Sequence, residues 1–286
     1  MSPPTPEQLD AQLESSRAPF LEHLDELRWR LWRALVGVVI AGVICAFWYK
    51  EIYAFLTAPF FEVLAAKKLP DRMVFRTLPG VFLFQFKAAI FGGIFLGLPV
   101  ILWQTWGFVA PGLYKHEQKL AFPFVIMSTV CFVGGSAFAY YLVLPQAFDF
   151  LLGYAIQGGP QKLTPDITIE DYFGFTTKVL LAFGVVFELP VAVAFLSGIG
   201  MITHRTLIHF WRWAIVLAFV LAAVLTPPDY VTQLMLAVPL CVLYVISIGI
   251  AYSITNARGD PTAPDESDPP ESTELDAPEA DAPEGD

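Results

Sequence analysis

The sequence predicts an all-α integral membrane protein with six transmembrane helices. Hydrophobic residues make up 56% of the 286 residues and charged residues only 15%, whereas a soluble domain of this size needs far more polar surface. Gly and Pro are frequent inside the apolar runs, which membrane helices tolerate because neighbouring helices satisfy the freed backbone groups. The third observation is the number and length of those runs.

Six apolar runs can serve as spans: residues 31–49, 81–106, 120–144, 173–201, 210–225 and 231–252. A helix needs ~20 residues to cross ~30 Å of hydrocarbon. The fifth run has only 13 uninterrupted apolar residues, Trp213 to Leu225, which rise about 20 Å at 1.5 Å per residue. The sequence TPPD then forces a turn. We therefore expect short fifth and sixth helices.

The segment before the first span has its own pattern. Its apolar residues recur at intervals of three and four: Phe20, Leu24, Leu27, Leu31 and Leu35. This spacing predicts an amphipathic helix with Pro19 in its first turn, which either lies along the membrane surface or extends the first span into water. Glu26 and Arg30 can pair on it at i,i+4. The simplest alternative is an ordinary interfacial anchor.

The charges suggest how the chain is organised and oriented. Because six spans place both termini on one side, and because Arg28, Arg30 and Arg33 lie beside the first span, we expect both termini in the cytoplasm. Residues 259–286 hold 11 of the 27 acidic residues and none of the 17 basic ones. We expect a cytoplasmic N-terminal segment (1–30), a six-helix transmembrane domain (31–252) and a disordered acidic cytoplasmic tail (253–286).

Glu188 lies in the middle of the fourth apolar run and is followed by Leu189 and Pro190. A carboxylate at that depth costs at least ~2.5 kcal/mol, so it must face protein, water or a partner rather than lipid. The functional interpretation is a polar patch that docks a polar group of a partner helix, or that admits water and thins the bilayer. The structural alternative is a carboxyl group satisfied inside the bundle by Ser, Thr or Lys178.

Two further carboxylates face the cytoplasm if the spans alternate. The link after the second span shares a side with Glu26, and it places Glu117 at the start of the third helix, where the helix dipole favours a negative charge. Taken alone, Glu117 can be a capping residue. Asp229, which follows two prolines, can likewise cap the sixth helix.

Four motifs in this order resemble the successive signatures of the TatC family, the multispanning core subunit of the twin-arginine protein translocase: residues 23–28 (HLDELR), 108–117 (FVAPGLYKHE), 183–190 (FGVVFELP) and 225–229 (LTPPD). The resemblance runs from about Phe20 to Tyr252 and leaves out the acidic tail. It implies a glove- or cup-shaped bundle in the cell inner membrane that is a receptor for twin-arginine signal peptides. With single-span TatA- and TatB-type partners, such a protein exports folded proteins using the proton-motive force.

The resemblance also assigns residues. It implies a signal-peptide site that contains Glu26, Arg28, Phe108, Leu113, Tyr114, Lys115, His116 and Glu117. Glu188 and Pro190 match an intramembrane polar site for partners, and Pro59 and Asp229 match positions on the periplasmic side. Asp25 departs from the pattern, because an apolar residue is also common there, and it makes this site more acidic.

The physical chemistry of the residues agrees with that assignment. Two guanidinium groups prefer two carboxylates in planar, charge-assisted pairs, a geometry that Lys does not reproduce. We expect Glu26 and Glu117 each to neutralise one arginine of an incoming peptide, while the apolar stretch of the peptide slides between helices.

Other functions were weighed against this one. An ion-coupled small-solute transporter, with Glu188 as the coupling carboxylate, would explain an echo between residues 91–100 and 183–191 that suggests a repeat with broken helices. A structural assembly factor is a third class. The four His are scattered and no phosphate loop or nucleophile motif is present, so we expect no enzyme activity, cofactor or metal. No basic stripe predicts nucleic-acid binding. We expect self-association in the bilayer.

Overall fold

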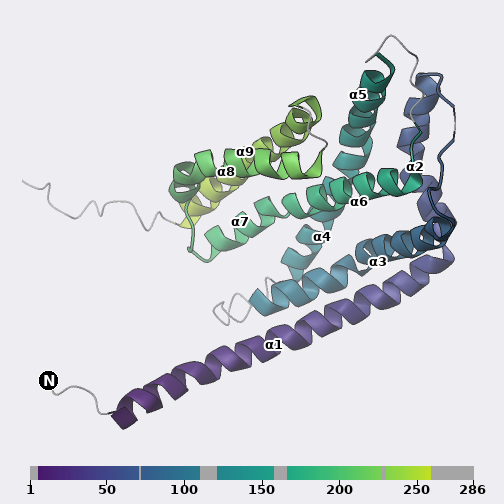
Figure 1. Cartoon of the computed structure of the whole chain (residues 1–286). Helices are drawn as coiled ribbons and strands as arrows, with labels where there is room; N and C mark the ends of the chain where they lie inside the picture. The colour runs from purple at the N-terminus through teal and green to yellow at the C-terminus, as the bar shows by residue number, and fades with distance from the viewer. Residues whose placement is uncertain (1–5, 71, 110–120, 158–165, 227–229, 259–286) are drawn as a thin grey trace, which may run out of the picture.

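The computed structural model describes residues 6–70, 72–109, 121–157, 166–226 and 230–258 (Figure 1). Within these residues every regular element is helical, and six segments are long and apolar enough to cross a membrane. These segments are Glu22–Phe47, Leu78–Phe108, Phe122–Gly153, Ile169–Gly198, His204–Leu225 and Tyr230–Ala257. The predicted all-α membrane fold with six spans is therefore confirmed.

Helix α1 (Pro6–Phe47) is one continuous helix of 42 residues. The segment before the first span therefore extends that span. The expectation that Pro19 lies in a first turn is wrong, because the helix begins at Pro6. Residues 7–14 (EQLDAQLE) consist almost entirely of strong helix formers, so the helix propagates through the polar segment as well.

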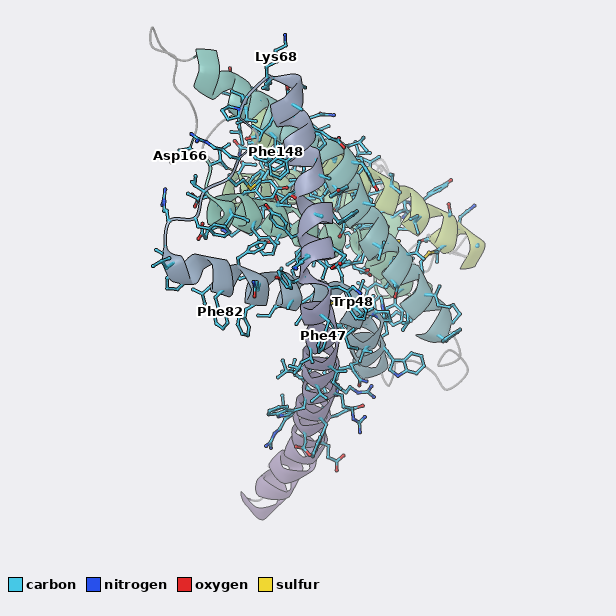
Figure 2. The ribbon with its side chains drawn as sticks, turned by 90° about the vertical axis from the view of Figure 1, so that its right-hand side faces the viewer. Phe47, Trp48, Lys68, Phe82, Phe148 and Asp166 are labelled. Carbon is cyan, nitrogen blue, oxygen red and sulfur yellow. The ribbon has the colours of Figure 1, made fainter. Side chains whose placement is uncertain are left out.

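Helix α2 (Tyr49–Ala66) follows α1 after a turn at Trp48. Figure 2 shows α2 running from Trp48 up to Lys68, and Figure 1 shows that α2 turns away from the line of α1. No helix was predicted here, although the buried Leu56, Phe60 and Leu64 are spaced four residues apart, as on one helix face. At its C-terminal end, Lys67 forms an ion pair with Asp149 of the third span at 2.9 Å.

Pro59 lies inside α2 and is accommodated by a tyrosine from another span. Proline cannot donate a hydrogen bond to the carbonyl four residues earlier, which here belongs to Phe55. The Tyr140 hydroxyl donates to the Phe55 carbonyl instead, at 2.6 Å, and the two rings stack with centroids 4.5 Å apart. Next to it, the Tyr172 hydroxyl donates to the Leu56 carbonyl at 2.5 Å. The two tyrosines fix α2 against the third and fourth spans.

Helix α3 (Leu78–Val109) runs beside α1 in the opposite direction (Figure 1). A Cβ atom on Gly93 would lie only 2.7 Å from the Cα of Gly42 on α1. One turn later, Gly97 approaches Val38. In lipid the hydrophobic effect does not drive helices together, so their association depends on close van der Waals packing. Small residues such as glycine permit that packing.

The third span is α4 (Ala121–Phe138), a π-helical turn η3 (Ala139–Val143) and α5 (Leu144–Gln157) in continuous succession. The π-turn stands just before Pro145, whose ring would clash with the carbonyl four residues earlier in a regular helix. The fourth span is divided into α6 (Ile169–Val186) and α7 (Leu189–Gly198).

The last two spans are α8 (His204–Leu225) and α9 (Tyr230–Arg258). With 22 residues, α8 is the shortest of the six candidate spans, and it ends at Leu225 as the turn sequence predicts. By contrast, α9 has 29 residues, so a short sixth helix is not what the structure shows. The helix continues past the apolar run because its polar residues bond within it, as when the Ser253 hydroxyl donates to the Gly249 carbonyl at 3.0 Å.

The spans differ in how deeply they are buried. In the apolar parts of α1 and α8 only 17% and 11% of the residues are buried, so these two helices form the edges of the arrangement. The main core lies among α2, α3, η3, α5, α6, α8 and α9, and a second cluster joins α3, α4 and α7. The N-terminal end of α1 and the C-terminal ends of α3, α7 and α9 lie toward the same side (Figure 1).

Candidate functional site

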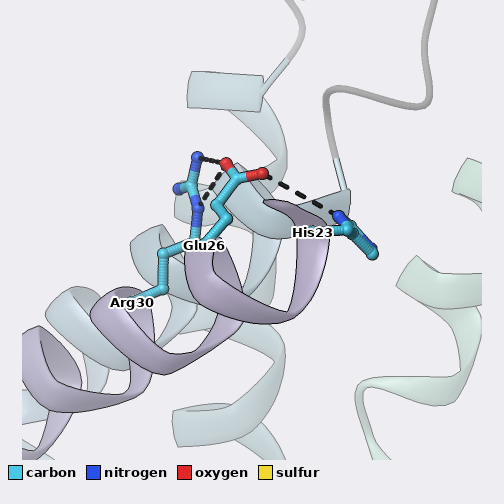
Figure 3. Close-up of polar contacts among 3 residues, drawn as sticks. All are labelled: His23, Glu26 and Arg30. Carbon is cyan, nitrogen blue, oxygen red and sulfur yellow. Dashed lines mark hydrogen bonds and ion pairs between the residues drawn. The ribbon is translucent and has the colours of Figure 1, made fainter. Parts of the chain in front are cut away.

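Glu26 lies near the N-terminal end of the first span and is paired with Arg30 one turn away (Figure 3). Arg30 donates to Glu26 Oε1 from both Nε, at 3.0 Å, and Nη2, at 2.6 Å. The Glu26 side chain is 34% exposed and the Arg30 side chain 23%. The predicted i,i+4 pair is therefore confirmed, and it is a close, charge-assisted contact.

The Arg30 guanidinium reaches over α3. Its Nη1 occupies the space that a Cβ atom on Gly107 would fill. Only glycine at that position lets the cation lie against the helix backbone. The pair is therefore held at the junction of α1 and α3 rather than extended into water.

Phe108, the next residue of α3, contacts the other side of the same site. Its ring stacks on the His23 imidazole with centroids 4.3 Å apart and planes at 16°. His23 Nδ1 lies 3.8 Å from Glu26 Oε2, beyond hydrogen-bond distance. The packing of α1 on α3 thus brings together Glu26 and Phe108, which are 82 positions apart in the sequence. We call this site, formed by His23, Glu26, Arg30 and Phe108, the rim.

Other residues predicted for this rim have different outcomes. Arg28 and Asp25 are exposed on α1, and Arg28 lies about 200° around the helix from Glu26 at 100° per residue. The remaining predicted residues lie outside the part of the chain that the structure describes: Leu113, Tyr114, Lys115, His116 and Glu117.

Glu188 lies at the break in the fourth span, between α6 and α7. Pro190 stands at the start of α7, where its missing N–H costs nothing, and it interrupts the helical bonding of the preceding turn. The Glu188 side chain makes no capping hydrogen bond to α7. Phe187, just before it, lies against Gly135 of α4, where a Cβ atom would be 2.5 Å from the ring. This close packing fixes the position of the break.

The surroundings of Glu188 are polar on one side only. Its carboxyl group lies close to the Ser128 side chain of α4. Ser128 is fully buried and accepts a hydrogen bond from Trp106 Nε1 of α3 at 2.8 Å. The other carboxyl oxygen, Glu188 Oε1, is buried and has no partner among the described residues. Lys178, the alternative partner, is exposed on α6.

One part of the site was not predicted from the sequence: the row of neighbouring side chains from Trp106 through Ser128 to Glu188. Trp106 packs in an aromatic cluster with Phe124 and Phe195, at centroid distances of 5.4 and 4.9 Å. These rings exclude water from the hydrogen bond between tryptophan and serine. A polar residue opposite Glu188 was expected only as an unspecified Ser or Thr.

Pro59, which was predicted for the periplasmic side, occupies the position in α2 described above. Asp229 lies outside the described residues. Within the described ranges, no three His, Cys, Asp or Glu side chains gather in a way that could hold a metal ion.

The comparisons with known proteins all point to one family. The family described as Sec-independent protein translocase protein (TatC) matches residues 22–239. The Sec-independent protein translocase protein TatC of Magnetococcus marinus is 38% identical over 251 residues, covering 88% of this chain and 90% of that protein. That of Desulforapulum autotrophicum is 41% identical over 239 residues, covering 82% and 84%. A crystal structure described as the twin arginine translocase receptor TatC is similar, with a TM-score of 0.72, 33% identity and coverage of 82% of this chain and 99% of that chain.

Proposed function

The chain belongs to the TatC family of multi-pass protein translocase components, and we propose that it is the receptor for twin-arginine signal peptides. With single-span partners of the TatA and TatB type, it exports folded proteins across the membrane using the proton-motive force. Both termini lie in the cytoplasm and the protein resides in the cell inner membrane, consistent with Arg28, Arg30 and Arg33 beside the first span.

The observation that carries this proposal is the rim where α1 meets α3. Glu26 presents a carboxylate that already binds a guanidinium group. Phe108 stacks on His23, and the His23 imidazole lies beside the same carboxylate. A peptide arginine needs this combination, because a carboxylate binds the charged fork and an aromatic surface packs against its flat face. The predicted second carboxylate, Glu117, belongs to the segment that follows α3 and completes the proposed site.

Glu188 supports the second half of the proposal, which is assembly with partner helices. A buried carboxyl oxygen without a hydrogen bond is unfavourable in hydrocarbon, so a polar group on an incoming helix would be stabilised there. We infer that this group binds TatA- or TatB-type partners at the break between α6 and α7. Pro190 contributes by keeping the break open.

Site-specific photocrosslinking tests the receptor function. A photoreactive residue at position 118, next to Glu117, should crosslink to a signal peptide with intact arginines and lose the crosslink when both are changed to lysine. Equal crosslinking of the two peptides would contradict the proposal. A second photoreactive residue at position 185, which is exposed and lies three residues before Glu188, should capture a partner helix but not the arginine pair.

The transporter alternative predicts that the echo in the second span is a second broken helix. Instead, α3 is continuous from Leu78 to Val109 with Pro99 inside it, whereas the fourth span is broken at Glu188. A pair of matching half-helices is thus not formed by these two segments. Solute uptake by the purified protein in vesicles without partners would restore this alternative.

A further inference from the structure

We propose that Arg30 competes with the arginines of the signal peptide for Glu26 and thereby sets the affinity that an export signal must exceed. The inference rests on the proposed function of Glu26 and adds a residue that controls it. It follows from three features of the rim: how the carboxylate is shared, what holds Arg30 in place, and which oxygen remains open.

Glu26 is occupied on one oxygen and open on the other. Arg30 directs both Nε and Nη2 to Oε1, at 3.0 and 2.6 Å (Figure 3). Among the residues that the structure describes, Oε2 faces only His23 Nδ1, at 3.8 Å. The receptor therefore presents a carboxylate that is already neutralised, not a bare negative charge.

A peptide arginine binds a carboxylate best with two parallel hydrogen bonds, one to each oxygen. It can make the first of them to Oε2 but completes the fork on Oε1 only when Arg30 withdraws. The free energy needed to move Arg30 lowers the affinity of each peptide that displaces it. Arg30 thus raises the threshold most for the arginine pair, whose fork needs both oxygens, and less for a lysine pair, whose ammonium groups can bind Oε2 alone.

Gly107 leaves the space in which the guanidinium group of Arg30 lies. Because Arg30 Nη1 occupies the place of a side chain at residue 107, Gly107→Ala would push the guanidinium aside. The group that must move is the end of a flexible side chain, so the helix itself is not disturbed. This gives a way to weaken the competitor without removing its charge.

The test measures binding of a fluorescent synthetic signal peptide to the full chain in lipid nanodiscs. The peptide is used in two forms, with an arginine pair and with a lysine pair. Arg30→Gln should raise the affinity for the arginine peptide about 2–5-fold, as expected for losing one part-exposed i,i+4 ion pair, and the affinity for the lysine peptide by less. Gly107→Ala should raise both in the same direction by less.

Controls separate the competitor from a general effect on folding or charge. Arg30→Lys keeps the charge without the fork and should fall between wild type and Arg30→Gln. In a Glu26→Gln background, Arg30→Gln should change nothing. An unchanged or lowered affinity for the arginine peptide in both Arg30→Gln and Gly107→Ala would overturn the inference alone. If Glu26→Gln leaves peptide affinity unchanged, and if the wild-type protein binds the arginine and lysine peptides equally well, the proposed function and this inference are both wrong.

Discussion

Glu26 and Glu188 are two carboxylates in very different surroundings. Glu26 is 34% exposed, lies on an unbroken helix and is neutralised by Arg30. Glu188 lies where a span is interrupted, contacts the Ser128 side chain and leaves Oε1 buried without a partner among the described residues. A part-exposed, paired charge can exchange its partner at modest cost, which suits recognition. A half-satisfied group in hydrocarbon is stabilised only by a new neighbour, which suits assembly.

The largest effect is expected from removing both proposed rim carboxylates, Glu26→Ala together with Glu117→Ala. Losing two charge-assisted hydrogen-bonded contacts, each worth about 1.5–3 kcal/mol, should lower signal-peptide affinity at least about 100-fold. The measurement is peptide binding in nanodiscs, with export of a folded reporter as a second readout. Asp25→Ala removes an exposed neighbouring acid and is the matched control. Unchanged binding in the double variant would show that the rim is not the receptor site.

The next effect is expected from Glu188→Leu and separates the two carboxylates. Export should fall about tenfold, because a polar contact between membrane helices worth about 1–2 kcal/mol is lost. Peptide binding at the rim should stay at the wild-type level. The thermal unfolding temperature in detergent should rise, since a buried unpaired oxygen costs about 1–3 kcal/mol. A parallel loss of peptide binding would mean that the two sites are one.

A smaller effect tests the hydrogen-bonded chain behind Glu188. Trp106→Phe removes the donor and Ser128→Ala removes the hydroxyl, and each should lower the free energy of unfolding by about 1 kcal/mol. The double variant should lose about 0.5–1 kcal/mol less than the sum of the two, because both act on one bond. Unfolding in mixed micelles measures all four proteins. Strict additivity would show that the bond contributes nothing.

The smallest effect concerns a buried polar contact without charge, which serves as a reference for both carboxylates. Tyr140→Phe should cost about 1 kcal/mol because the Phe55 carbonyl loses its donor. In a Pro59→Ala background the cost should fall to about half of that, since the alanine N–H can bond to the same carbonyl. The readout is again unfolding in mixed micelles. An equal cost in both backgrounds would separate Tyr140 from Pro59.

The six spans and the Glu26–Arg30 pair could be predicted because both depend on local spacing. Apolar runs of span length identify membrane helices, and an acid and a base four residues apart meet on one helix face. Helix α2 was missed because it is short for a span and contains Pro59. The length of α9 was missed because polar residues such as Ser253 continue a helix beyond its apolar part.

The contacts between spans were not predictable from spacing. Trp106 and Ser128 are 22 residues apart on different helices, and only the packing of α3 on α4 brings them together. The stacking of His23 on Phe108 likewise depends on α1 and α3 approaching through Gly42 and Gly93. Family motifs identified Phe108 and Glu188, but they did not show what each of them contacts.

The last turns of α3 have a mechanical consequence. Trp106 and Phe108 are two residues apart, so they project in nearly opposite directions, about 200° around the helix axis. One side chain contacts the histidine at the rim and the other holds the serine beside the membrane acid. A helix end is stiff over so short a distance, so a tilt of the end of α3 would move both contacts together.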